Sequence, residues 1–384
     1  MAALRAIGNG YQAAIMAPTE LLAEQHLRSF SEWFEPLGIE PIWLSSKVTG
    51  KARLSALDAI EQGASLVIGT HALMQEGVHF NRLGLAVVDE QHRFGVHQRL
   101  ALLDKAGIES AHAHQLIMTA TPIPRTLAMT AYAGLETSVI DELPPGRKPV
   151  TTVIISNERR RDVISRVAGA CADGQQAYWV CTLIEESDAV QAQAAEQVAR
   201  ELMDGLEDVT VGLVHGRMKA AEKQSVMDRF KHGDVQLLVA TTVIEVGVDV
   251  PNASLMIIEN AERLGLAQLH QLRGRVGRGG QQASCVLLYS PPIGQLAKER
   301  LKILRETSDG FRIAEKDLEL RGPGEVLGTR QTGMLQFRVA DLARDQELLD
   351  RIPPVADRLL SGNPRQVEKL VQRWIGDAER FAGV

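Results

Sequence analysis

The sequence predicts an α/β protein with two parallel-sheet domains and a helical C-terminal part. Short apolar runs alternate with helical patterns along residues 12–120, and the same alternation returns along 151–290. Runs that are apolar throughout indicate strands covered by helices on both faces, as in parallel sheets. A proline-rich stretch interrupts the alternation, and the apolar runs stop after about residue 295. These three observations predict two α/β domains joined by a linker and followed by helices.

The first domain is expected to contain four strands. The predicted strands are 12–17, 65–70, 85–90 and 115–120. The predicted helices between the first two are 19–34 and 51–62. The chain opens on a pattern typical of the end of a helix, because Gly8, Asn9 and Gly10 follow a short Ala/Leu run as stop signals. We therefore expect that an earlier segment has been lost.

The linker is predicted from "DELPPGRKPV" at 141–150, because its three prolines and one glycine continue neither a helix nor a central strand. Beyond it, strands are predicted at 151–156, 177–183, 209–216, 235–242, 253–260 and 283–290. The predicted division is 1–142 for the first domain, 143–150 for the linker, 151–295 for the second domain and 296–384 for a helical C-terminal part.

Composition limits the classes of protein that this chain can belong to. With 384 residues, 45% of them hydrophobic, the chain can bury the cores of two or three domains. Its net charge of −6 excludes a uniformly basic nucleic-acid coat, so any nucleic-acid site must be a local basic surface. Three scattered cysteines do not form a disulfide framework or a zinc site; Cys181 and Cys285 lie in apolar runs and are expected to be buried. No signal peptide or membrane-spanning segment is recognisable, which favours a cytoplasmic location without a membrane partner.

An acidic pair follows the strand predicted at 85–90, in "AVVDEQHRFGVHQR". Ligands of open parallel sheets bind beyond the carboxyl ends of the strands. Asp89 is therefore a candidate to hold Mg²⁺ beside a nucleotide phosphate, and Glu90 to orient or deprotonate the attacking water. The alternative is that Asp89 caps a following helix.

Two hydroxyls occur at the end of the next predicted strand, in "MTATPIPRT" at 118–126. Thr119 and Thr121 are expected at the same sheet edge as the acidic pair and could hydrogen-bond it. The alternative is an ordinary exit from a strand, with Pro122 and Pro124 marking the turn.

The segment "QLHQLRGRVGRGG" at 268–280 spaces Arg273, Arg275 and Arg278 with glycines. Arginine binds phosphate oxygens through two donors, and glycine permits close approach to a ligand. Two of these arginines could act on a γ-phosphate held by the other domain. The alternatives are a solvated basic loop and a general anion or RNA contact.

The segment "ATTVIEVGVDVPNA" at 240–253 follows another predicted strand. The hydroxyls of Thr241 and Thr242 are candidates for contacts with a nucleic-acid backbone. Gly247 and Asp249 are candidates for contacts with the nucleotide.

Together these segments resemble the motifs of superfamily 2 helicases, in the same order. "APTELLAEQ" at 17–25 resembles motif Ia, "GTHAL" at 69–73 resembles a strand-end DNA contact, and "HGRM" at 215–218 lies where motif IV is expected. "DEQHRFGVHQR", "TATPIPRTLAM" and "FRIAEKDLELRGPGEVLGTRQTG" at 311–333 resemble the RecG family of DNA helicases. This resemblance extends over essentially the whole chain.

The resemblance implies two RecA-like domains, ATP and Mg²⁺ as cofactors, and ATP-driven translocation on double-stranded DNA that remodels stalled forks and migrates branched junctions. Branched or forked DNA and a single-strand DNA-binding protein are the implied partners. The implied catalytic residues are Asp89, which would hold Mg²⁺, Glu90 as general base, and Gln271, Arg275 and Arg278. The implied nucleotide contacts are Thr119, Thr121, Gly247 and Asp249. The implied DNA contacts are Thr19, Thr70, His71, Thr241 and Thr242.

The glycine-rich tail resembles a translocation motif shared by the RecG family and the transcription-repair coupling factor Mfd. Arg321 and Arg330 are the residues that we expect to couple domain closure to DNA movement. Without the family, the mixed charges of this tail are also compatible with a salt-bridged, solvated surface.

The chain departs from the family in one respect, because no G-x-x-x-x-G-K-[ST] phosphate loop occurs in it. We expect a fragment that begins just after that loop, without the strand leading into it and without the wedge domain. Such a fragment should hydrolyse ATP weakly or not at all. Two alternatives stay open here: the motor portion of Mfd, and a non-catalytic module that binds DNA or a protein.

Overall fold

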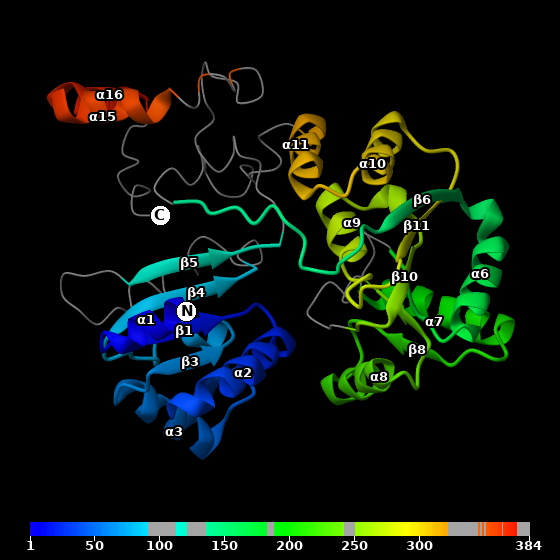
Figure 1. The fold of residues 1–384 in the computed structure, drawn as a ribbon, viewed down its shortest axis with the longest axis horizontal. Coiled ribbons are helices and arrows are strands. Elements are labelled where there is room, and N and C mark those ends of the chain that lie inside the picture. The colour runs from blue at the N-terminus through cyan, green and yellow to red at the C-terminus, as the bar shows by residue number, and fades with distance from the viewer. Residues whose placement is uncertain are drawn as a thin grey trace. The chain divides into compact units, whose positions relative to one another are not determined.

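The computed structural model describes residues 1–90, 113–120, 136–182, 188–241, 250–321, 345, 348, 351–362 and 364–374. The chain divides into two compact units (Figure 1). Met1–Ala120 makes up nearly all of the first unit, and most of the remaining chain belongs to the second. Each unit contains one parallel sheet, so the predicted α/β class is confirmed.

The sheet of the first unit has the strand order β2-β3-β1-β4-β5, with every neighbouring pair parallel. Its strands are β1 (Gln12–Met16), β2 (Ile42–Leu44), β3 (Leu66–Gly69), β4 (Leu83–Asp89) and β5 (His114–Met118). Its helices are α1 (Ala2–Gly8), α2 (Glu20–Phe34) and α3 (Gly50–Glu61), with 3₁₀ turns η1 (Glu35–Leu37) and η2 (His71–Met74). Because β1 pairs in parallel with both β3 and β4, the carboxyl ends of these three strands lie side by side, and the strand order reverses at β1.

Both faces of this sheet are covered, as the uniformly apolar strands predict. One core cluster joins Ala14 and Met16 of β1 to Ile60 of α3. The other joins Ile15 of β1 to Phe34 of α2 and to α1. Alternate residues of one strand thus contribute to two cores, which is why β1 and β3 are buried at every position.

The second sheet has the order β6-β11-β10-β7-β9-β8, again with all neighbours parallel. Its strands are β6 (Thr151–Ser156), β7 (Gln176–Val180), β8 (Val211–Val214), β9 (Leu237–Ala240), β10 (Ala253–Ile258) and β11 (Ser284–Tyr289). The helices of this unit are α6 (Arg160–Ala172), α7 (Asp188–Gly205), α8 (Ala220–His232), α9 (Leu266–Arg273), α10 (Gln295–Glu306), α11 (Gly310–Arg321), α15 (Ile352–Gly362) and α16 (Pro364–Trp374), with 3₁₀ turns η4 (Asn157–Arg159) and η6 (Ala261–Arg263).

Helices α10 and α11, which follow the last strand, pack against other elements of the second unit. Helix α10 packs against β6, η6 and α9, and α11 packs against α9 and α10. Leu301 and Leu304 of α10 and Ile313 and Leu318 of α11 are all buried. The apolar faces of these two helices therefore complete the core around α9.

The segment predicted as a linker and the cysteines predicted to be buried lie in the second compact unit. Residues 141–150 form no helix or strand, and Gly146 turns the chain at a φ of +81°. Cys181 and Cys285 are buried free thiols, as predicted, and burial raises the pKa of Cys285 to about 12. Among the helices in the described ranges, none has the length and apolarity needed to cross a membrane.

Candidate nucleotide and DNA sites

The acidic pair lies at the carboxyl end of β4, in the middle of the first sheet. Asp89 closes the strand, and Glu90 adopts a left-handed backbone with a φ of +50°. A non-glycine residue in this conformation costs roughly 1 kcal/mol or more and often marks a functional site.

Both carboxylates of the pair are held by neighbours. Oδ1 of Asp89 accepts a hydrogen bond from the N–H of Glu90 at 2.9 Å, and Oδ2 lies 2.7 Å from Nε2 of His26 on α2. Oε2 of Glu90 accepts from the N–H of Ala120, just beyond β5, at 3.3 Å. A contact between the acidic pair and the Thr-Ala-Thr segment therefore runs through the backbone of that segment. Thr119 is half-buried beside it, whereas Thr121 lies outside the described residues.

The three DNA-backbone candidates of the first unit lie at the same sheet edge. Thr19 caps α2, its hydroxyl accepting from the N–H of Leu22 at 3.4 Å. Thr70 follows β3 and is only 2% exposed, and its hydroxyl has no hydrogen-bond partner among the described residues. His71 follows it and is exposed at the start of η2. The fold thus brings residues from positions 19 to 119 to one edge.

This edge fits a Mg-nucleotide in its chemistry. No group of three or more His, Cys, Asp or Glu side chains that could hold a metal by itself occurs among the described residues. Mg²⁺ commonly takes one or two carboxylates and completes its shell with phosphate oxygens and water. Asp89, an oxygen donor with 17% of its side chain exposed, suits that arrangement.

In the second unit, the arginine segment follows β10 through η6 and α9. Gln271 and Arg275 are half-buried, and Arg278 is exposed. Arg273 differs from them, because only 4% of it is exposed and burial lowers its pKa. Of the three arginines singled out in this segment, Arg273 is therefore a structural residue and is not available to a ligand.

Arg273 takes part in a reciprocal clasp between α9 and α10. Its Nη1 donates to the carbonyls of Leu304 and Thr307, at 2.7 and 2.8 Å, at the end of α10. In return, Arg300 of α10 donates to the carbonyls of Glu262 and Leu264, at 3.0 and 2.9 Å, ahead of α9. Since helix-terminal carbonyls lack partners within their helix, each arginine satisfies acceptors that would otherwise stay unpaired.

His270 makes this clasp sensitive to acid. Its Nδ1 accepts from Nη2 of Arg273 at 2.9 Å, which requires an unprotonated Nδ1. Burial, and next the charge of Arg273, lower the pKa of His270 from 6.5 to about 4. Between these pH values the unfolded chain binds the proton and the folded chain does not. The free energy of unfolding should therefore fall as the pH is lowered from about 6.5 to about 4, by up to about 3 kcal/mol.

Urea unfolding at several pH values checks this expectation. In the variant His270→Asn the amide oxygen can still accept from Arg273 but does not titrate, so the loss of stability across this pH range should become smaller. The same loss in both proteins would show that other groups are responsible.

Glycine is required in the arginine segment by the conformation and close approach of the backbone. Gly277 has a φ of +74°, in the region that favours glycine. A Cβ on Gly279 would lie 2.3 Å from the carbonyl oxygen of Pro251. The expected close approach at Gly279 is thus to the protein's own chain.

The remaining candidates are only partly within the described structure. Thr241 follows β9, is 3% exposed and donates its N–H to the carbonyl of Val214 at 3.3 Å. Arg321 is the last residue of α11. Outside the described residues lie Thr242, Gly247, Asp249 and Arg330.

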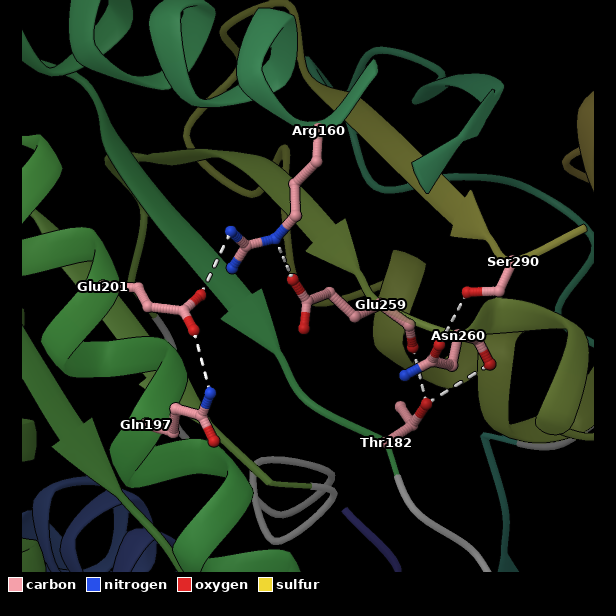
Figure 2. Close-up of polar contacts among 7 residues, drawn as sticks. All are labelled: Arg160, Thr182, Gln197, Glu201, Glu259, Asn260 and Ser290. Atoms are coloured by element: carbon pink, nitrogen blue, oxygen red, sulfur yellow. Dashed lines mark hydrogen bonds and ion pairs between the residues drawn. The ribbon is translucent and has the colours of Figure 1, made fainter. Parts of the chain in front are cut away.

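Sequence reasoning missed a polar cluster at the carboxyl edge of the second sheet (Figure 2). Arg160 of α6 donates through Nε to Glu259 at 2.7 Å, pairs with Glu201 of α7 at 3.4 Å, and lies over the ring of Trp179. The hydroxyl of Thr182, after β7, donates to the carbonyl of Glu259 at 2.5 Å. These bonds fix the turn that leads from β10 towards α9. Because the partners are up to 99 positions apart, no local pattern could have revealed them.

Three family models match separate stretches of the chain. The DEAD/DEAH box helicase model matches residues 1–130, and the helicase conserved C-terminal domain model matches 160–280. The model of ATP-dependent DNA helicase RecG, domain 3, C-terminal, matches residues 307–372. The chain belongs to the RecG family. This outcome agrees with the predicted RecG resemblance rather than with the Mfd alternative.

Sequence relatives in the RecG family match from end to end of this chain. ATP-dependent DNA helicase RecG of Escherichia coli strain K12 is 63% identical over 384 residues, covering 100% of this chain and 55% of that protein. The protein of the same name from Pasteurella multocida is 61% identical, with 100% and 56% covered. The chain therefore spans about half the length of the curated relatives it matches.

Solved structures show the same architecture. A RecG bound to a three-way DNA junction matches with a TM-score of 0.69 and 44% identity, covering 91% of this chain and 45% of that one. A DUF1998 helicase MrfA bound to DNA and AMPPNP matches with a TM-score of 0.61 at 14% identity, covering 88% and 54%, which is evidence for the fold alone. Two RecA-like units are thus the shared architecture.

Proposed function

We propose that this chain supplies the two motor units of an ATP-dependent DNA translocase that remodels stalled replication forks and migrates branched junctions. The observation that carries the proposal is the convergence of Asp89, Glu90, Thr19, Thr70 and Thr119 at one carboxyl edge of the first sheet. Ligands of open parallel sheets bind there, and these side chains suit a nucleotide with Mg²⁺ and a phosphate backbone. The 44% identical RecG bound to a three-way DNA junction supports branched DNA as the substrate.

The proposed roles at the nucleotide site are divided between the two units. Asp89 holds Mg²⁺, and Glu90, the next residue at the same sheet edge, is the general base for the attacking water. Gln271, Arg275 and Arg278 stabilise the charge that develops on the γ-phosphate. Thr119, Thr121, Gly247 and Asp249 contact the nucleotide or report its state. A single-strand DNA-binding protein is the proposed protein partner.

The proposed DNA contacts are independent of base sequence. Thr19, His71 and Thr242 offer hydroxyl, imidazole and backbone donors suited to phosphate oxygens. Thr70 and Thr241 belong to the same proposed set, but they are 2% and 3% exposed and their N–H groups bond to Leu44 and Val214. Arg321 and Arg330 couple domain closure to movement along the DNA. With a net charge of −6, the chain depends on local contacts, so binding should weaken steeply with salt.

ATP hydrolysis with and without forked DNA tests this function. We expect the 384-residue polypeptide to hydrolyse ATP at background rates, because its sequence contains no phosphate loop to bind the β- and γ-phosphates. A chimaera that joins this chain to the unmatched part of the E. coli relative should hydrolyse ATP, and forked DNA should stimulate it. A well-folded chimaera that binds forked DNA without stimulated hydrolysis would overturn the proposed function. A 384-residue chain as active as the chimaera would show that other residues bind the phosphates.

A further inference from the structure

Helix α2 carries a histidine directed at the end of the adjacent strand β4. Nε2 of His26 lies 2.7 Å from Oδ2 of Asp89, and the two side chains are only 21% and 17% exposed. An ionised carboxylate can only accept hydrogen bonds, so Nε2 carries the hydrogen and donates it. A neutral imidazole is sufficient for this bond, which therefore does not depend on a charged histidine.

The ring of His26 is held in place by an aromatic row on its own helix. It packs edge-on against Phe30 with a centroid separation of 6.4 Å, and Phe30 packs in turn against Phe34 at 5.5 Å. Phe34 is only 2% exposed and belongs to the core beneath α2. The imidazole is thus anchored through Phe30 to the buried face of the first sheet.

The bond from His26 fixes the rotation of a carboxylate that still has capacity for other ligands. The N–H of Glu90 donates to Oδ1 of Asp89 and His26 donates to Oδ2. A carboxylate has about four acceptor positions, so about two of them stay available for Mg²⁺ or its water. Groups that orient a metal ligand in this way commonly change metal affinity or activity 10- to 100-fold when removed.

A proposed DNA contact, Thr19, lies at the N-terminus of the same helix, α2. Thr19 caps α2, and His26 lies two turns further on, about 10 Å along the axis. Building on the proposed function, we propose that His26 is a positioning residue for Asp89 and that α2 transmits contact with the DNA backbone to the nucleotide site. A displacement of α2 by DNA would alter the bond between His26 and Asp89 and thereby the orientation of the carboxylate.

Two substitutions in the chimaera described above test the proposal. His26→Leu removes the donor at similar volume, whereas His26→Gln retains an amide donor near the position of Nε2. The measurements are the Mg²⁺ concentration for half-maximal ATP hydrolysis, with and without forked DNA, and, without turnover, Mn²⁺ binding in the presence of ADP by electron paramagnetic resonance. We expect His26→Leu to raise the Mg²⁺ concentration for half-maximal hydrolysis by about 10-fold or more and to weaken Mn²⁺ binding by a similar factor. It should also reduce the stimulation of ATP hydrolysis by forked DNA. His26→Gln should stay close to the parent.

The controls separate this inference from the proposed function. If Asp89→Asn raises the Mg²⁺ requirement and His26→Leu does not, the positioning role is wrong and the function stands. If Asp89→Asn leaves the Mg²⁺ requirement unchanged, the role of Asp89 in the proposed function fails. Should His26→Leu not fold, His26→Asn, whose shorter side chain stops short of Asp89, should show the same loss. Glu32→Gln, at an exposed position of α2, should resemble the parent.

Discussion

Glu90→Gln should reduce DNA-stimulated ATP hydrolysis by the chimaera by about 10²- to 10⁴-fold, because an amide cannot accept the proton of the attacking water. Binding of ATP and forked DNA should change little, since glutamine has nearly the same shape and can still accept the bond from the N–H of Ala120. The ratio of kcat to KM, with separate binding measurements, distinguishes a lost base from a lost ligand contact.

Glu61→Gln is a matched control, because Glu61 is an exposed residue at the end of α3. It should leave hydrolysis unchanged. Equal activity of Glu90→Gln and the parent would remove Glu90 from the mechanism and would leave its left-handed backbone without a functional explanation.

Arg273→Met should lower stability and Arg278→Met should lower ATP hydrolysis, although the two arginines lie only five positions apart in one segment. Arg273→Met leaves the carbonyls of Leu304 and Thr307 without their donor and should lower the free energy of unfolding by about 3 kcal/mol. Arg278 is exposed, so Arg278→Met should change stability by no more than about 0.5 kcal/mol. The same substitution should reduce ATP hydrolysis strongly, if Arg278 stabilises the γ-phosphate.

Urea unfolding and steady-state ATP hydrolysis of the two variants check this separation. A stable, active Arg273→Met protein would contradict the structural role of the clasp. Full activity of Arg278→Met would exclude this arginine from the nucleotide site. The two outcomes are independent, because one depends on the packing of α9 against α10 and the other on catalysis.

Strand prediction succeeded where strands are buried on both faces. The runs at 12–17 and 65–70 correspond to β1 and β3, which are apolar at every position because helices cover them twice. Strand β2 was missed, because its three residues follow Pro41 at the edge of the sheet and bond only to β3. So short an edge strand has no periodicity of its own, and only its partner defines it.

The sequence by itself determined the fold class, the family and the acidic pair after β4, because these depend on local patterns of apolar, glycine and charged residues. The tertiary structure decided which of these residues act together. Arg273 and Arg278 look equivalent in "RGRVGRGG", and only the packing of α10 separates a buried clasp from an exposed side chain. His26 and Asp89 are 63 positions apart, so their contact follows from the strand order that places α2 beside β4. Long-range pairs of this kind depend on topology, which no local pattern contains.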